Sequence, residues 1–180
     1  MTDESAPAAL GGLDPAVLEK LRRGFPLRMD RQGNFNFEGD AITHPGVVDF
    51  FRACLDVTEA GEVTLGSGLT GGQWLYLKCD DLPLRALRVD EARGEGESGP
   101  QLLLDDGRRV ALDPESLWEE PGAGLRCTAP ARESGRPLGV RLRNAAAMDL
   151  SRWMVWEDED ARPELEIDGQ RRAIPEVAPG

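Results

Sequence analysis

The chain has 180 residues, 40% of them hydrophobic, a size that fits one ordinary domain or two small lobes sharing a core. Its 33 acidic residues outnumber 21 Lys and Arg residues, and a net charge of −12 argues against duplex nucleic acid because the average field repels polyphosphate. No apolar run reaches the ~18–20 residues of a membrane span, and residues 1–10 are acidic where a signal peptide is basic. Three cysteines without a CxxC spacing fit a reducing compartment. We therefore expect a cytoplasmic protein without membrane association, and the scarcity of Lys beside many Ala, Gly and Pro residues favours a bacterial source.

The N-terminal part of the chain predicts a tail, a short helix and a small sheet. Residues 1–12 are too polar to offset their ordering entropy, so we expect a disordered tail. Asp14 suits an N-cap and Pro15 suits the first helical turn, and the helix that they open should end at Gly24. Segment 27–42 alternates around two glycine-containing turns, which predicts a β-meander.

A longer amphipathic helix is predicted over about residues 43–57. Its apolar side chains recur at helical spacing and form one stripe, made of Val47, Val48, Phe51, Cys54 and Leu55. Residues 73–80 are dense in β-forming side chains and predict a strand, with 84–89 as its expected neighbour. The charged, glycine-rich segment 92–100 predicts either a linker or a hairpin tip.

One unit recurs along the chain at irregular intervals. Segments 102–112 and 165–174 both place Asp-Gly between apolar strand residues, and segment 35–42 is a looser third copy. Asp-Gly between alternating apolar runs is a strong signal for a tight hairpin with a type I′ turn. The sequence therefore predicts repeated β-hairpins.

The C-terminal part of the chain predicts a loop, a strand and a last helix. Residues 121–135 are loop-like, and 139–143 alternate as a strand. Asp149 can cap a helix over about 150–158 that carries Leu150, Trp153 and Met154. Residues 176–180 are expected to form a tail.

The sequence contains none of the catalytic motifs that we considered. His44 is the single histidine, so neither a site with several histidines nor a Ser-His-Asp type triad can form, and we expect no metal, no cofactor and no enzymatic activity. His44 falls in the first turn of the predicted helix, where it is either solvated or a ligand contact.

Three groups of residues are candidates for binding. Trp74 is either a core side chain or a stacking surface for a ligand. Arg85 and Arg88, which flank Ala86-Leu87, are either solvated strand residues or part of an anion-binding patch. The third group comprises Trp156, Glu157, Asp158, Glu159 and Asp160. It is either a solvated helix end or a contact surface for a basic partner. In a contact surface, the Trp156 indole would anchor the partner and the carboxylates would steer its approach.

Segment 31–55 resembles a known family. Gly33, Phe35, Gly39 and Ile42 stand at the family's places before an amphipathic helix, and Trp-Leu-Tyr-Leu at 74–77 with Asp-Leu-Pro at 81–83 resembles its next strand and turn. The chain, over about residues 27–175, resembles domain of unknown function family 1285, bacterial proteins of about this length. The resemblance implies two β-rich lobes, the second superficially like a pleckstrin-homology fold, a ligand-binding cleft between them and no enzymatic activity.

These observations predict an α+β fold with two small β-rich lobes, each built from hairpins and carrying a helix. The predicted boundaries are a tail at 1–12, a first lobe at 13–91, a linker or hairpin tip at 92–100, a second lobe at 101–175 and a tail at 176–180. The predicted function is a non-catalytic binding or adaptor module in bacterial signalling or regulation, with a ligand or a protein partner at the cleft. The alternatives are a protein that binds a small anionic or nucleotide-like ligand and an enzyme of unrecognised type.

Overall fold

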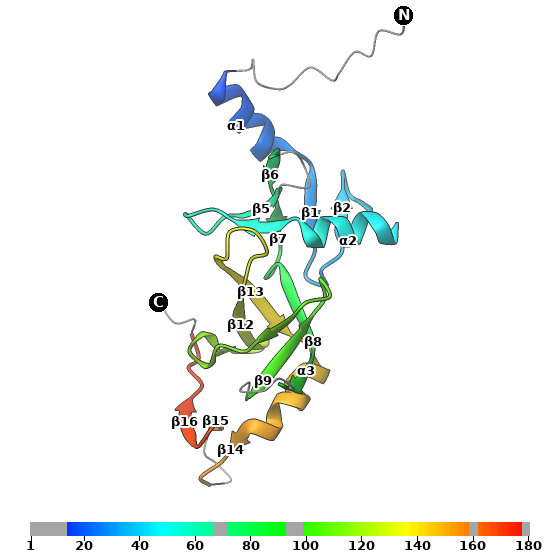
Figure 1. Cartoon of the computed structure of the whole chain (residues 1–180). Coiled ribbons are helices and arrows are strands. Elements are labelled where there is room, and N and C mark those ends of the chain that lie inside the picture. The colour runs from blue at the N-terminus through cyan, green and yellow to red at the C-terminus, as the bar shows by residue number, and fades with distance from the viewer. Residues whose placement is uncertain (1–13, 67–71, 93–98, 159–161, 178–180) are drawn as a thin grey trace, which may run out of the picture.

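The computed structural model describes residues 14–66, 72–92, 99–158 and 162–177. The predicted tail at 1–12 and most of the predicted linker at 92–100 lie outside the described residues. The molecule is elongated, with α1 at one end and the small sheet β14–β16 at the other (Figure 1). The α+β class is confirmed, since three α-helices accompany four separate sheets in the described part of the chain.

The N-terminal unit holds two small sheets, in the orders β3-β2-β1-β7 and β4-β5-β6. In this unit β1 pairs antiparallel with β2 and parallel with β7. Its elements are α1 (Pro15–Gly24), β1 (Leu27–Met29), β2 (Phe35–Phe37), β3 (Asp40–Ala41), α2 (Pro45–Ala53), β4 (Leu55–Val57), β5 (Val63–Gly66), β6 (Trp74–Tyr76) and β7 (Lys78–Cys79).

The central sheet has six strands in the order β10-β9-β8-β13-β12-β11, and α3 packs against β8 and β13. A three-stranded sheet, β14-β15-β16, follows it. The elements are β8 (Leu84–Glu91), β9 (Pro100–Leu104), β10 (Arg109–Ala111), β11 (Trp118–Glu120), β12 (Gly124–Pro130), β13 (Pro137–Leu142), α3 (Asn144–Leu150), β14 (Met154–Val155), β15 (Glu164–Ile167) and β16 (Gln170–Ala173), with short 3₁₀ turns at Pro114–Ser116 and Ser151–Trp153.

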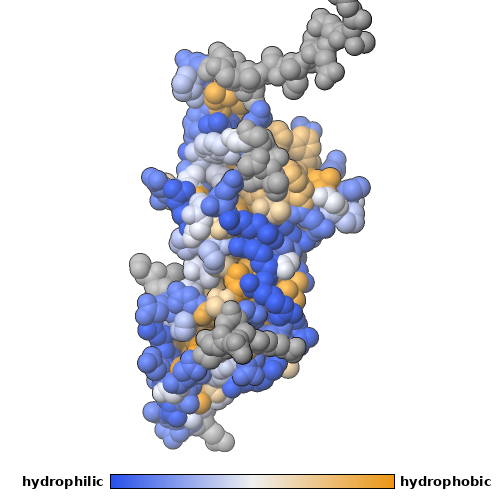
Figure 2. Space-filling model, in the orientation of Figure 1, coloured by the Kyte–Doolittle hydropathy of each residue, from blue (hydrophilic) through white to orange (hydrophobic). Residues whose placement is uncertain are grey.

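One hydrophobic core runs through both units. Leu27 and Phe35 of the N-terminal unit belong to the same buried cluster as Leu84, Val140 and Leu150 of the central sheet and α3. On the face shown in Figure 2, hydrophobic residues gather over α2 and near α1, whereas the middle of the molecule is mostly hydrophilic. The line along which the N-terminal unit meets the central sheet, called the seam below, is therefore apolar inside and polar outside.

The three predicted hairpins are confirmed. In two of them, both turn residues have positive φ, 52° and 97° at Glu38-Gly39 and 51° and 75° at Asp168-Gly169, as a type I′ turn requires. In the hairpin of β9 and β10 only Gly107 has positive φ, 83°. The predicted helix start at Asp14 is also confirmed, because its carboxylate accepts from the Ala16 N–H at 2.7 Å.

Two helix boundaries were wrong. The helix predicted over 43–57 ends at Ala53, and Leu55–Val57 forms β4 because it pairs with Val63–Leu65. The helix predicted over 150–158 with Asp149 as its cap is absent, since Asp149 lies in the last turn of α3. There its carboxylate accepts from the Val89 N–H at 3.1 Å, which ties the end of α3 to β8.

Two strand predictions were also wrong. Segment 121–135, predicted as a loop, contains β12, and 84–89 is not a neighbour of 73–80. Instead β8 pairs antiparallel with β9 and parallel with β13. The strands on either side of the predicted 92–100 boundary thus share one sheet, and the chain leaves the N-terminal unit near residue 80. No helix within the described residues is long and apolar enough to cross a bilayer.

Candidate functional site

Arg85 on β8 links the two units. Its side chain is buried, and its guanidinium donates to the carbonyl of Leu82 beside it and, across the seam, to the carbonyls of Arg31 at 2.9 Å and Asp30 at 3.4 Å. Gly33 lies against the same guanidinium, since a Cβ there would come within 2.8 Å of its Nε. Arg85 therefore anchors the turn between β1 and β2.

The charge of Arg85 persists despite burial. Burial lowers the pKa of Arg85, while the carboxylates of Asp105 and Asp81 act in the opposite direction. A guanidinium is not deprotonated in proteins, so the group keeps its positive charge. The buried Asp105 carboxylate accepts from the Arg85 N–H at 3.0 Å and lies 3.6 Å from Arg52 of α2, a second link across the seam.

The turn between β1 and β2 is fixed by its own sequence. The Asp30 carboxylate accepts from the Gln32 N–H at 2.9 Å and from the Asn34 N–H at 2.8 Å, while Gly33 adopts a φ of 90°. Burial would raise the pKa of Asp30, but its hydrogen bonds, those from Asn34 above all, lower it. These hydrogen bonds fix the backbone of the turn, and the side chains of Arg31 and Gln32 are exposed on it.

Beside this turn lies a cavity of about 590 Å³, called the arginine cavity below. The β1–β2 turn supplies one wall, and β8, the end of β13 and the start of α3 supply the rest. Its lining residues are Arg31, Gln32, Arg85, Arg141, Leu142, Arg143, Asn144 and Ala145. Four arginines thus converge on one space, and no described carboxylate lines it.

The lining arginines differ in how their charge is met. Arg141 donates to Asp81 at 3.1 Å, and Asp81 also accepts from Arg126 at 2.7 Å. Burial would raise the pKa of Asp81, but the Leu82 N–H and both guanidinium groups hold it below its usual value.

Two of the lining arginines have no ion-pair partner among the described residues. Arg31 and Arg143 are exposed, and neither makes a side-chain hydrogen bond or ion pair with another described residue. The arginine cavity is therefore a positive site in an acidic protein.

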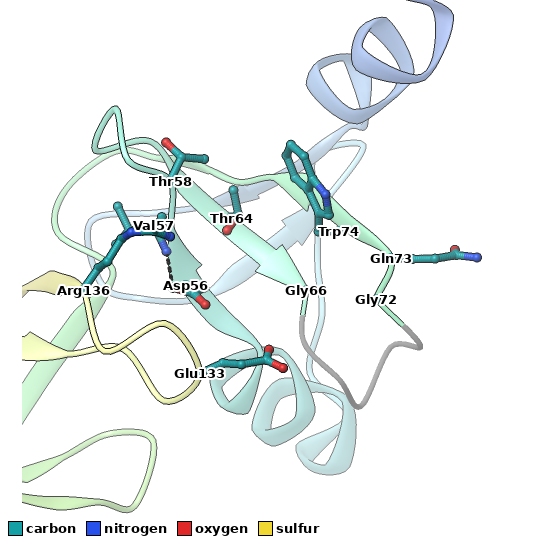
Figure 3. A pocket seen from close by; sticks show the side chains of 10 residues that line it. All are labelled: Asp56, Val57, Thr58, Thr64, Gly66, Gly72, Gln73, Trp74, Glu133 and Arg136. Carbon is teal, nitrogen blue, oxygen red and sulfur yellow. Dashed lines mark hydrogen bonds between the residues drawn. The ribbon is translucent and has the colours of Figure 1, made fainter. Parts of the chain in front are cut away.

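A second cavity, of about 320 Å³, lies on the seam beside β4, β5 and β6. Figure 3 shows Trp74 on its N-terminal wall and Glu133 and Arg136, from the loop between β12 and β13, on the other. Two of its lining side chains already have partners within the protein, since Arg136 donates to Glu59 at 3.0 Å and the centre of the Trp74 ring lies 4.1 Å from the Arg22 guanidinium.

The structure does not bring the four predicted ligand-binding residues together. Arg85 lines the arginine cavity and Trp74 lines the second cavity. Arg88 lies away from both, where its guanidinium donates to Asp149 at 2.6 and 3.1 Å. His44 is exposed at the N-cap of α2.

The predicted acidic contact surface is only partly described. Trp156 is 52% exposed, and Glu157 and Asp158 are exposed beside it. Glu159 and Asp160 lie outside the described residues. This segment follows β14 rather than ending a helix.

Sequence reasoning predicted only Arg85 among the lining residues of the arginine cavity and missed its other three arginines, Arg31, Arg141 and Arg143. Arg141 and Arg143 stand two residues apart at the end of a predicted strand, a spacing that could have drawn attention to them. Arg31 carried no such signal, because only the fold places the β1–β2 turn beside β13.

The described parts define an α+β protein with two β-rich units and an arginine-lined cavity on their seam. No protein-family model and no curated protein matches the chain. Among solved structures, a DUF1285 family protein from Silicibacter pomeroyi DSS-3 matches 83% of this chain and 79% of its own, with a TM-score of 0.61 and 18% identity. A DUF1285 family protein from Shewanella baltica OS155 matches 71% of this chain and 91% of its own, with a TM-score of 0.53 and 15% identity. The resemblance to this family is therefore confirmed at the level of the fold.

Proposed function

We propose that this protein is a non-catalytic binding module that takes a small anionic ligand in the arginine cavity. The observation that carries the proposal is the convergence of Arg31, Arg85, Arg141 and Arg143 on one space of about 590 Å³, a volume within the usual range of ligand sites. A cytoplasmic role in bacterial signalling or regulation belongs to the same proposal, and the composition of the sequence supports its cytoplasmic and bacterial parts.

The net charge of −12 does not oppose a local anion site. Exposed charges farther away than about 8 Å are largely screened at physiological salt, whereas charges lining a partly enclosed space act at short range. Arginine also presents a planar fork of N–H groups that matches carboxylate and phosphate oxygens in pairs. The net charge of the whole chain therefore predicts repulsion of anions, whereas the arginines that line the cavity attract them.

The same lining supports a binding role over a catalytic one. General acid–base catalysis works best with a group whose pKa lies near the operating pH. The described lining side chains are guanidinium, amide and aliphatic groups, and none of them is a carboxylate, an imidazole or a thiol. Such a site can hold and orient an anion, but it offers no group to exchange protons with it.

Isothermal titration calorimetry with small polyanions tests the proposal. Because hydrogen bonds to charged groups contribute about 1.5–3 kcal/mol each, Arg31→Ser with Arg143→Ser should weaken binding at least about a hundredfold. Arg109→Ser with Arg171→Ser is the matched control, since both side chains are about half exposed and the net charge changes equally. Equal binding by wild type and the cavity variant would refute the site.

A further inference from the structure

We infer that the ligand of the arginine cavity is a compact molecule with two or more phosphate groups and no nucleobase. This inference rests on the proposed function and narrows the class of anion. Its two parts, the number of phosphate groups and the lack of a base, follow from different features of the lining.

The number of phosphate groups follows from the free donors. The guanidinium of Arg85 already donates to three backbone carbonyls, so it would attract an anionic ligand through its charge rather than through hydrogen bonds. Arg31 and Arg143 keep whole forks, and Arg141 uses only Nη1 in its hydrogen bond to Asp81. Three forks offer more N–H groups than a single carboxylate or orthophosphate can accept, whereas two phosphates supply six or more terminal oxygens.

The charges around the cavity also indicate a ligand with two phosphate groups. Arg141 shares Asp81 with Arg126, and Arg126 also pairs with Glu120 at 2.8 Å, so this group of four is balanced. Arg85 shares the carboxylate of Asp105 with Arg52, so these three groups keep one positive charge, and with Arg31 and Arg143 three positive charges are left around the cavity. A phosphate monoester carries about −1.5 to −2 at neutral pH, so two of them match this excess and one does not.

The arrangement also indicates that the ligand spans the seam. Arg31 comes from the β1–β2 turn of the N-terminal unit, whereas Arg141 comes from the end of β13 and Arg143 from the N-cap of α3. Two phosphate groups on one short scaffold can engage both walls at once. The ligand would then add to the link that Arg85 already makes between the two units.

The lack of a base follows from what the lining does not offer. No aromatic side chain is among the described lining residues, and the apolar contacts come from Leu142 and Ala145 alone. Stacking on an aromatic ring contributes about 1–3 kcal/mol per base, and a nucleotide would forgo it here. The amides of Gln32 and Asn144 are suited instead to hydroxyl groups or phosphate oxygens.

Calorimetry at fixed ionic strength without Mg²⁺ tests this class with six probes: orthophosphate, citrate, pyrophosphate, tripolyphosphate, a hexose bisphosphate and ATP. Pyrophosphate, tripolyphosphate or the bisphosphate should bind at least tenfold more tightly than orthophosphate and citrate. ATP should bind no more tightly than tripolyphosphate. Arg31→Ser with Arg143→Ser should abolish these differences, and the Arg109 and Arg171 control should retain them.

The outcomes separate the inference from the function on which it rests. If the bisphosphate binds best, and Gln32→Ala with Asn144→Ala removes only that advantage, the ligand is a phosphorylated polyol; if tripolyphosphate binds best, it is an inorganic oligophosphate. ATP or citrate binding most tightly, in a manner lost in the cavity variant, would overturn the inference and leave the anion-binding function standing. No binding of any probe at millimolar concentration would overturn the function itself.

Discussion

Replacement of Arg85 by Ala tests the claim that this side chain holds the β1–β2 turn to the central sheet. The guanidinium donates to the carbonyls of Leu82, Arg31 and Asp30, the last through a long contact of 3.4 Å. A hydrogen bond to a charged group contributes about 1.5–3 kcal/mol, and Arg31 is exposed, so water can replace one of the bonds. We therefore expect a loss of about 3 kcal/mol in the free energy of unfolding.

Urea unfolding followed by tryptophan fluorescence measures this loss. Since small domains are stable by about 5–15 kcal/mol, the variant should still fold, with a clearly lower midpoint. Arg109→Ala is the control, because that side chain is half exposed in a single ion pair and should change stability by less than about 1 kcal/mol. An Arg85→Ala protein within about 0.5 kcal/mol of wild type would refute the anchoring role.

Three further predictions follow from single positions. Gly33→Ala should cost about 2–3 kcal/mol of unfolding free energy and Gly39→Ala about 1, because both have positive φ but only Gly33 lies against Arg85; equal losses in urea unfolding would contradict this contact. Hydrogen bonds from Arg88 lower the pKa of Asp149 to about 2, so their stabilisation is fully present above about pH 4 and lost as the pH falls toward 2. The difference in urea midpoint between wild type and Asp149→Asn should shrink over that range, and a constant difference would contradict it. Burial raises the pKa of Cys127 to about 12, so iodoacetamide at pH 8 should label this thiol in urea and not in the native protein, as peptide mass spectrometry can check.

The candidate site was only partly accessible to sequence reasoning. Arg85 was predicted as a possible anion ligand, and it does line the cavity, but its donors serve backbone carbonyls. Arg88, which the same sequence pattern predicted as a ligand residue, pairs with Asp149 instead. A pattern of arginines shows where charge is available, whereas the partner of each guanidinium depends on residues 54 to 61 positions away. That is why the site's free arginines, Arg31 and Arg143, were not found.

The sequence by itself determined the local features of this protein. Asp14 before Pro15 starts α1, and Asp168-Gly169 makes the turn between β15 and β16, because capping and tight turns depend on a few adjacent residues. Only the tertiary structure decided the long-range features: α2 ends at Ala53 because the next residues pair with β5, and β13 pairs with β8 across more than fifty residues of chain. The arginine cavity belongs to the second kind, since it exists only where the β1–β2 turn meets the end of β13, and nothing in either segment alone specifies that meeting.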